Sequence, residues 1–130
     1  MSERFRPEQH LRKAIFFRIV FEKGKRSKGR VINLWVCETA QLGETQKSEK
    51  PKLGVIVSRK TDLRATRRNL WKRRIREVFR KEQHQMREGI TVLVQSKKQN
   101  AVPSYEDISK EMKHLLAALG ALKAPGAETQ

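Results

Sequence analysis

The sequence has little of what a secreted, membrane-spanning or metal-binding protein needs. Its 130 residues contain a single cysteine, Cys37, so an internal disulfide is impossible and a cysteine-based metal site is not expected. No apolar run reaches the length of about 18 residues that a transmembrane helix requires. Residues 1–7 lack the apolar core of a signal peptide. Together these absences predict a protein of a reducing cytoplasm that has no contact with a membrane.

Catalytic groups are also scarce. The three histidines, His10, His84 and His114, lie far apart in the sequence, and none neighbours a paired carboxylate or a serine motif. A protein nuclease could be built from His10, His84, Glu77 and Glu82, but Glu77 and His84 share one predicted helix with no partner in view. We therefore predict that the chain carries neither catalytic residues nor metal ligands.

What the sequence does have is positive charge. Thirty basic and 14 acidic side chains give a net charge of +16. Charge of this size opposes compactness through self-repulsion, so we expect a polyanionic partner. The excess is unevenly placed: residues 59–80 hold ten basic and two acidic side chains, whereas residues 101–130 have a net charge of −1. Such a concentration is typical of a binding surface.

Hydrophobic periodicity and breaker residues predict alternating helices and strands. Gly24 is expected to end the first helix as a left-handed cap, Thr61 or Asp62 to cap the second, and Ser104 to cap the third. The helices are predicted over about residues 13–23, 64–87 and 104–120, and the strands over 31–37, 53–58 and 90–95, with a short extra strand at 29–31 and a polar loop at 39–51.

This order predicts an α/β (α+β) two-layer sandwich, in which helices pack on a small mixed sheet of about four strands. Residues 1–120 are expected to form a single RNA-binding domain, and residues 121–130 a disordered tail. If strands 53–58 and 90–95 are parallel neighbours, the helix between them would by default make a right-handed crossover.

The central helix is predicted to have two opposite faces. Trp71, Ile75, Val78, Phe79 and Met86 form one apolar stripe that should pack on the sheet. The opposite side carries a cationic ridge about 24 Å long, over roughly 16 residues. The cationic ridge consists of Arg64, Arg67, Arg68, Asn69, Lys72, Arg73, Arg76 and Arg80.

Nucleic acid is the partner that best explains this ridge. A helix face that only contacts solvent usually carries both positive and negative side chains, but here only Glu77 interrupts the cations. A membrane-bound helix would leave large apolar residues without another place to be buried, whereas this stripe has a sheet to cover. No helix-turn-helix, zinc finger or leucine zipper accompanies the helix, so DNA is not expected and a shaped RNA is favoured.

Aromatic residues beside cations form a second candidate site. Phe17 and Phe21 lie four residues apart on one predicted helix, and Trp35 lies on the next strand, with Arg18, Lys25, Arg26, Lys28 and Arg30 nearby in the sequence. Aromatic rings and cations together suit single-stranded nucleic acid. The residues alone leave a second interpretation open, in which these rings only form the core stripe of a short helix.

Two segments closely resemble the signature of the bacterial ribonuclease P protein component. They are residues 57–60, with the sequence VSRK, and residues 64–80, with the sequence RATRRNLWKRRIREVFR. The family signature is a strand ending in serine and two lysines, followed by an Arg-Asn-Arg-x-x-Lys-Arg helix. The pattern of residues 11–30 and the strand and leucine-rich helix of residues 90–119 are similar to the family as well.

The resemblance implies a function. Members are the small protein subunit of a ribonucleoprotein that removes the 5′ leader of precursor transfer RNA endonucleolytically, while a catalytic RNA subunit performs the reaction with Mg²⁺. The residues that would bind this RNA are Lys60, Arg64, Arg67, Arg68, Asn69, Lys72, Arg73 and Arg76. The single-stranded leader would lie in a cleft with Phe17, Phe21 and Trp35, where the family more often has tyrosine at the last position.

The resemblance also implies a bacterial, cytoplasmic protein with the fold of ribosomal protein S5 domain 2 and a left-handed crossover around the central helix. Besides Trp35, the sequence departs from the family at two places. Leu70 replaces the second arginine of the Arg-Asn-Arg triplet, for which Arg67 could substitute, and Asp62-Leu63 replaces a usual glycine. A ribosomal-type or RNA-chaperone protein is the alternative function.

Overall fold

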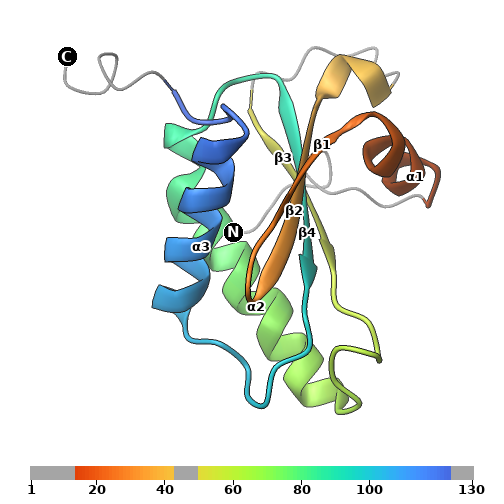
Figure 1. Cartoon of the computed structure of the whole chain (residues 1–130), viewed down its shortest axis with the longest axis vertical. Helices are drawn as coiled ribbons and strands as arrows, with labels where there is room; N and C mark the ends of the chain where they lie inside the picture. Colours follow the sequence, from red (N-terminus) through yellow and green to blue (C-terminus); the bar gives the residue numbers. More distant parts are fainter. Residues whose placement is uncertain (1–13, 43–49, 124–130) are drawn as a thin grey trace, which may run out of the picture.

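One mixed sheet and three α-helices make up the part of the chain that the computed structural model describes, residues 14–42 and 50–123 (Figure 1). Short 3₁₀ helices lie at Thr39–Leu42 and Gln83–Gln85. The main elements are α1 (Ala14–Lys23), β1 (Lys25–Lys28), β2 (Ile32–Glu38), β3 (Lys52–Ile56), α2 (Ala65–Glu82), β4 (Ile90–Ser96) and α3 (Tyr105–Ala118).

The sheet has the strand order β1-β2-β4-β3. β1 pairs with β2, and β2 with β4, in antiparallel fashion, whereas β3 and β4 run parallel. Parallel neighbours cannot be joined by a tight turn, and α2 provides the crossover between them. The predicted α+β class with a mixed sheet of four strands and three helices is confirmed; the left-handed sense of the crossover stays a prediction.

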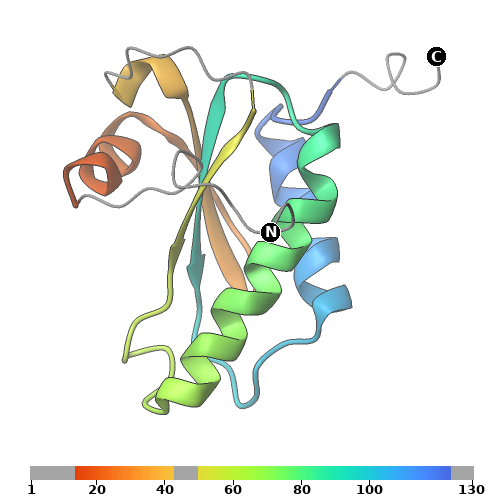
Figure 2. The ribbon, with the colours of Figure 1, turned by 180° about the vertical axis from the view of Figure 1, so that it is seen from behind.

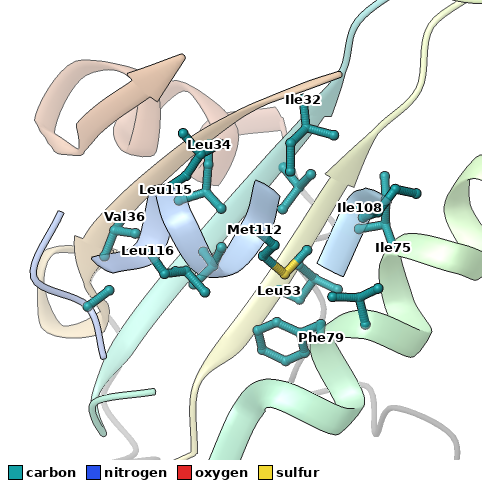
Figure 3. Close-up of a cluster of buried hydrophobic side chains, with 14 of the residues drawn as sticks. Ile32, Leu34, Val36, Leu53, Ile75, Phe79, Ile108, Met112, Leu115 and Leu116 are labelled. Atoms are coloured by element: carbon teal, nitrogen blue, oxygen red, sulfur yellow. The ribbon is translucent and has the colours of Figure 1, made fainter. Parts of the chain in front are cut away.

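The main core lies between the sheet and the pair α2 and α3, which cover the same face side by side (Figure 2). Strand alternation places every second residue of β2 on this face. The predicted apolar stripe of α2 is confirmed, since Trp71, Ile75, Val78 and Phe79 are at most 1% exposed. Figure 3 shows Ile32, Leu34, Val36, Leu53, Ile75, Phe79, Ile108, Met112, Leu115 and Leu116 interlocked in this core.

The opposite face of the sheet carries a smaller cluster under α1, which lies on the other side of the sheet from α2 and α3 (Figures 1 and 2). Val20, Trp35, Cys37 and Leu93 are buried there. β2 therefore contributes to both clusters, with its even-numbered apolar residues on one face and Trp35 and Cys37 on the other.

Gly24 ends α1, but the predicted left-handed cap is wrong. Among the described residues only Gly89 and Gly120 have positive φ, at 76° and 68°. A Cβ on Gly24 would instead lie 2.5 Å from the carbonyl oxygen of Val20 and 3.2 Å from that of Val36. Glycine is needed because the backbone passes close to two carbonyls where the chain leaves α1 for β1.

The start of α2 also differs from the prediction. Arg64 is the N-cap and makes no side-chain capping bond. Thr61 and Asp62 precede this N-cap, and their side chains accept no backbone N–H from within α2. The hydroxyl of Thr61 lies 2.9 Å from the Ser96 hydroxyl, and Asp62 Oδ1 accepts a 3.0 Å bond from the Arg64 backbone N–H. α2 ends at Glu82 rather than near residue 87, since a 3₁₀ helix follows.

At α3 the prediction is confirmed, because Ser104 Oγ accepts a 3.1 Å bond from the Asp107 backbone N–H. The predicted tail began at residue 121, but Ala121 is buried and Leu122 pairs with Met86. The structure therefore keeps residues 121–123 in the fold. The rest of the predicted tail, most of the loop 39–51 and His10 lie outside the described residues.

The turn between β1 and β2 is held by one carboxylate of α3. Residues 29–31, predicted as a short strand, form this turn, and the basic stretch before them forms β1. Glu111 accepts backbone N–H bonds from Arg30 (3.0 Å), Val31 (2.6 Å) and Ile32 (2.8 Å). A Cβ on Gly29 would collide with the same carboxylate. One side chain thus fixes the hairpin to α3.

We expect Glu111→Ala to lower the free energy of unfolding by about 2 kcal/mol, because three backbone donors lose a charged acceptor at a partly buried turn. Urea unfolding followed by circular dichroism measures this loss. Glu111→Gln keeps one acceptor oxygen and should lose about half as much. Equal stability of Glu111→Ala and the unmodified chain would show that water satisfies the three N–H groups equally well.

Candidate nucleic-acid interface

The cationic ridge lies on α2, on the side away from the sheet. The apolar stripe of α2 fixes this orientation, because the burial of Trp71 and Ile75 against the sheet turns the opposite face of the helix toward solvent. The structure places the predicted RNA-binding side chains in two groups. Lys60, Arg64, Asn69, Arg73 and Arg76 are exposed, whereas Arg67, Arg68 and Lys72 are partly buried.

Two of the partly buried arginines hold the structure around the start of α2. Arg67 Nε lies 2.6 Å from Asp62 Oδ2, and its Nη2 donates a 2.9 Å bond to the carbonyl of Asn100. Arg68 Nη1 donates 3.0 Å bonds to the carbonyls of Asp62 and Leu63. Much of the hydrogen-bonding capacity of these two guanidinium groups is therefore used inside the protein.

Arg64, Arg73 and Arg76 differ from this pair. Within the described residues, their side chains make no hydrogen bond or ion pair with another residue. An arginine in this state offers its planar five-donor fork to a phosphate group. The capacity of the ridge to bind phosphate is therefore concentrated in these three side chains, together with Lys60 and Lys72.

Leu70 occupies the position where the family signature has its second arginine, and it is partly buried on α2. Arg67 was expected to substitute for the missing cation. Its guanidinium is held by Asp62 and Asn100, so in the unbound protein it is available only in part. Arg73, three residues further along α2, is exposed.

Arg68 and Arg73 should therefore respond differently to truncation. We expect Arg68→Ala to lower the free energy of unfolding by about 1 kcal/mol, because two carbonyls lose their donor. The corresponding drop in melting temperature is about 4 °C. Arg73→Ala should leave the melting temperature unchanged while weakening RNA binding. Calorimetry on both variants decides; equal melting temperatures would mean that the bonds of Arg68 contribute nothing to stability.

The aromatic residues Phe17, Phe21 and Trp35 come together beside α1. The rings of Phe21 and Trp35 meet edge to face, with centroids 4.8 Å apart and planes at 83°. Phe17 packs on the cluster that contains Trp35. Exposure separates their possible roles: Phe21 is 41% exposed, whereas Trp35 is only 6% exposed. Trp35 therefore supports the cluster from below, and Phe21 offers the accessible ring.

Register places cations next to these rings. Arg26 lies opposite Trp35, and Lys28 lies opposite Asn33. Residues directly opposite in an antiparallel pair project to the same face of the sheet, so both exposed cations share the face of Trp35. The sequence placed five basic residues near the aromatics but could not select among them, because the register of β1 against β2 decides which ones face the cluster.

Two of the residues from which a protein nuclease could be built, Glu77 and Glu82, lie beside basic side chains. Glu77 makes bonds of 3.1 and 2.7 Å with Arg80, and this hydrogen bonding lowers the pKa of its carboxyl group below its usual value. Glu82 is buried and lies 3.3 Å from Lys113, while His84 is exposed. In the described ranges, no three His, Cys, Asp or Glu side chains gather in a way that could hold a metal ion.

Cys37 is buried on the second strand, where it is the free cysteine of the chain. Burial raises the pKa of its thiol to about 11, and the nearby negative charge of Glu38 adds to this effect. The thiol is therefore neutral at physiological pH and is a poor nucleophile.

The fold and the ridge define a small α+β protein with one strongly cationic helix face, which is the organisation of a nucleic-acid-binding protein. No helix in the described part of the chain has both the length and the apolar character to cross a membrane. The family model for ribonuclease P matches residues 5–120. The chain belongs to this family.

Curated relatives agree with this assignment. The ribonuclease P protein component of a Synechocystis strain is 31% identical over 104 residues, which cover 80% of this chain and 79% of the relative. That of Xylella fastidiosa is 33% identical over 104 residues, covering 80% and 70%.

Solved structures share the fold. The RNase P protein of Staphylococcus aureus superposes with a TM-score of 0.73 at 21% identity, covering 88% of this chain and 98% of that one. The RNase P protein of Thermotoga maritima reaches a TM-score of 0.65 at 22% identity, covering 92% and 100%.

Proposed function

We propose that this chain is the protein subunit of a bacterial ribonuclease P and that it binds the catalytic RNA subunit through the cationic ridge. The observation that carries the proposal is that three exposed arginines have no internal side-chain partner among the described residues: Arg64 at the N-cap of α2, and Arg73 and Arg76 on the packed helix itself. Their number and spacing suit several phosphates of a folded RNA.

The aromatic cluster and its cations are proposed to hold the single-stranded 5′ leader of precursor transfer RNA. An unpaired base can stack on the exposed ring of Phe21, which Trp35 supports edge to face. Arg26 and Lys28 on the same face can follow the phosphates of the leader. The two surfaces lie on different elements, α2 and the α1–sheet junction, so one chain can contact both RNAs together.

The holoenzyme would act in the bacterial cytoplasm as an endoribonuclease, hydrolysing the precursor at the mature 5′ end. In this proposal the RNA subunit supplies the chemistry together with Mg²⁺. The described residues offer no cluster of ligands for the metal, so we assign no step to a protein-bound ion. The role of the chain is to raise substrate affinity by neutralising phosphate repulsion and by retaining the leader.

Reconstitution tests this function. A ribonuclease P RNA is incubated with precursor transfer RNA at low Mg²⁺, with and without the chain. We expect efficient leader removal only when the chain is present, and no cleavage by the chain alone. Cleavage that is equally slow with and without the chain would count against the proposal, as would recovery of ribosomal RNA rather than this RNA in a pull-down.

A further inference from the structure

An exposed leucine lies at the end of the cationic ridge. Leu63 is 84% exposed and belongs to the loop between β3 and α2. Phe21 is the other large hydrophobic side chain that is exposed among the described residues, and it already has a proposed role. A single exposed leucine is common on protein surfaces, so exposure alone carries no conclusion. Leu63 differs from such a residue in its cationic surroundings and in the rigidity of its loop.

The loop around Leu63 is tied down on both sides. Thr61 is buried and lies 2.9 Å from the Ser96 hydroxyl. Asp62 bonds to the Arg64 backbone N–H and to the Arg67 side chain. These bonds fix the backbone on which Leu63 projects, so the side chain is presented to solvent by a preorganised loop.

The carbonyl of Leu63 itself is also fixed, because Arg68 donates to it and to the carbonyl of Asp62. Two ridge arginines are thus used to hold the loop in this shape. Nothing in the described structure covers the leucine side chain that they present. Because the loop backbone is already ordered, a partner that contacts the Leu63 side chain would cause little loss of conformational entropy.

The surroundings of Leu63 are strongly cationic. The loop and the segment after β4 line a shallow, open hollow of about 590 Å³, and Leu63 is part of its lining. The basic side chains that line the same hollow are Arg59, Lys60, Arg64, Arg67 and Lys98. Figure 2 shows that the β3–α2 loop and the segment after β4 both lie near the N-terminus of α2. A protein partner with an apolar pocket would have to desolvate all these charges, whereas RNA neutralises them.

From this arrangement we infer that Leu63 makes an apolar contact with the face of an unpaired nucleobase of the ribonuclease P RNA, while the cations around it bind the adjacent phosphates. The inference rests on the proposed function. In an A-form helix the base faces are stacked on one another and the major groove is too narrow for side chains. An apolar side chain can therefore reach a base face only in a loop, at a bulge or at a helix end.

Binding measured over a range of salt concentrations tests this contact, with Lys98→Ala as the matched control from the same hollow. Leu63→Ala removes apolar surface but no charge, so affinity should fall about fivefold at every salt concentration. The slope of log K against log salt should stay unchanged. Lys98→Ala should instead make that slope less steep by roughly one. Leu63→Trp should recover or exceed the original affinity, since its ring stacks on any base.

Chemical probing of the RNA bases provides a second readout. One unpaired base should be protected by the unmodified chain and by Lys98→Ala, and become reactive with Leu63→Ala. If the unmodified chain does not bind the RNA, the proposed function and this inference fail together. If it binds and Leu63→Ala matches it in affinity and protection, only this inference is overturned. The same holds if Leu63→Ala changes only the self-association of the chain in sedimentation.

Discussion

The Arg73→Glu, Arg76→Glu double variant is expected to bind ribonuclease P RNA about 100-fold more weakly than the unmodified chain at physiological salt. Both side chains are exposed on one face of α2, and neither has a partner among the described residues. Each substitution removes a phosphate contact and adds a repulsive charge. Filter binding over a range of salt concentrations should also show that the slope of log K against log salt is less steep by roughly two.

The matched control is Lys110→Glu, Lys123→Glu, which changes the net charge by the same amount outside α2 at two exposed positions. If long-range attraction between the whole protein and the RNA dominates, both double variants will weaken binding equally. If the ridge is the binding surface, the control will retain most of its affinity. Circular dichroism verifies that both variants keep their helices, as we expect because all four side chains are exposed.

Phe21→Ala is expected to weaken binding of precursor transfer RNA to the holoenzyme about tenfold, and to leave binding of mature transfer RNA unchanged. The reason is that only the precursor carries a single-stranded leader whose base can stack on the exposed ring. Phe21 is 41% exposed and its edge-to-face partner Trp35 is buried, so truncation removes the accessible ring and leaves its support. Phe17→Ala should act in the same direction.

Two further substitutions separate stacking from simple apolar contact. Phe21→Trp keeps a flat ring and should retain precursor affinity, whereas Phe21→Leu keeps apolar surface without a ring and should behave like Phe21→Ala. Equal losses for precursor and mature transfer RNA would contradict a leader contact at this position. They would indicate instead that the aromatic residues only stabilise the packing of α1.

Local sequence signals predicted most of the fold. The stripe of α2 was recognisable because Trp71, Ile75, Val78 and Phe79 recur at helical spacing, and all are buried. Ser104 was recognisable as a cap because its partner Asp107 lies three residues away. In both cases the interacting groups are neighbours along the chain, so the pattern contains the information.

Two predictions that rested on local turn and cap signals were wrong. Gly24 ends α1 as expected but has no left-handed conformation; a Cβ there would lie 2.5 Å from the carbonyl oxygen of Val20 in α1, and the carbonyl of Val36 on β2 adds a tight contact at 3.2 Å. Thr61 was expected to cap α2, but its hydroxyl is taken up by Ser96, 35 residues further along. Turn and cap signals describe what a residue can do locally, and tertiary contacts decide which option is used.

The sequence by itself determined where the charge lies, that one face of the central helix is cationic, and the family resemblance that the comparisons confirmed. Only the tertiary structure decided which arginines face outward without an internal partner. Arg67 differs from Arg73 because Asp62 and the carbonyl of Asn100 lie within its reach, and strand register alone put Arg26 beside Trp35. Charge is a property of the residue, whereas the availability of that charge depends on acceptors that folding brings from elsewhere in the chain.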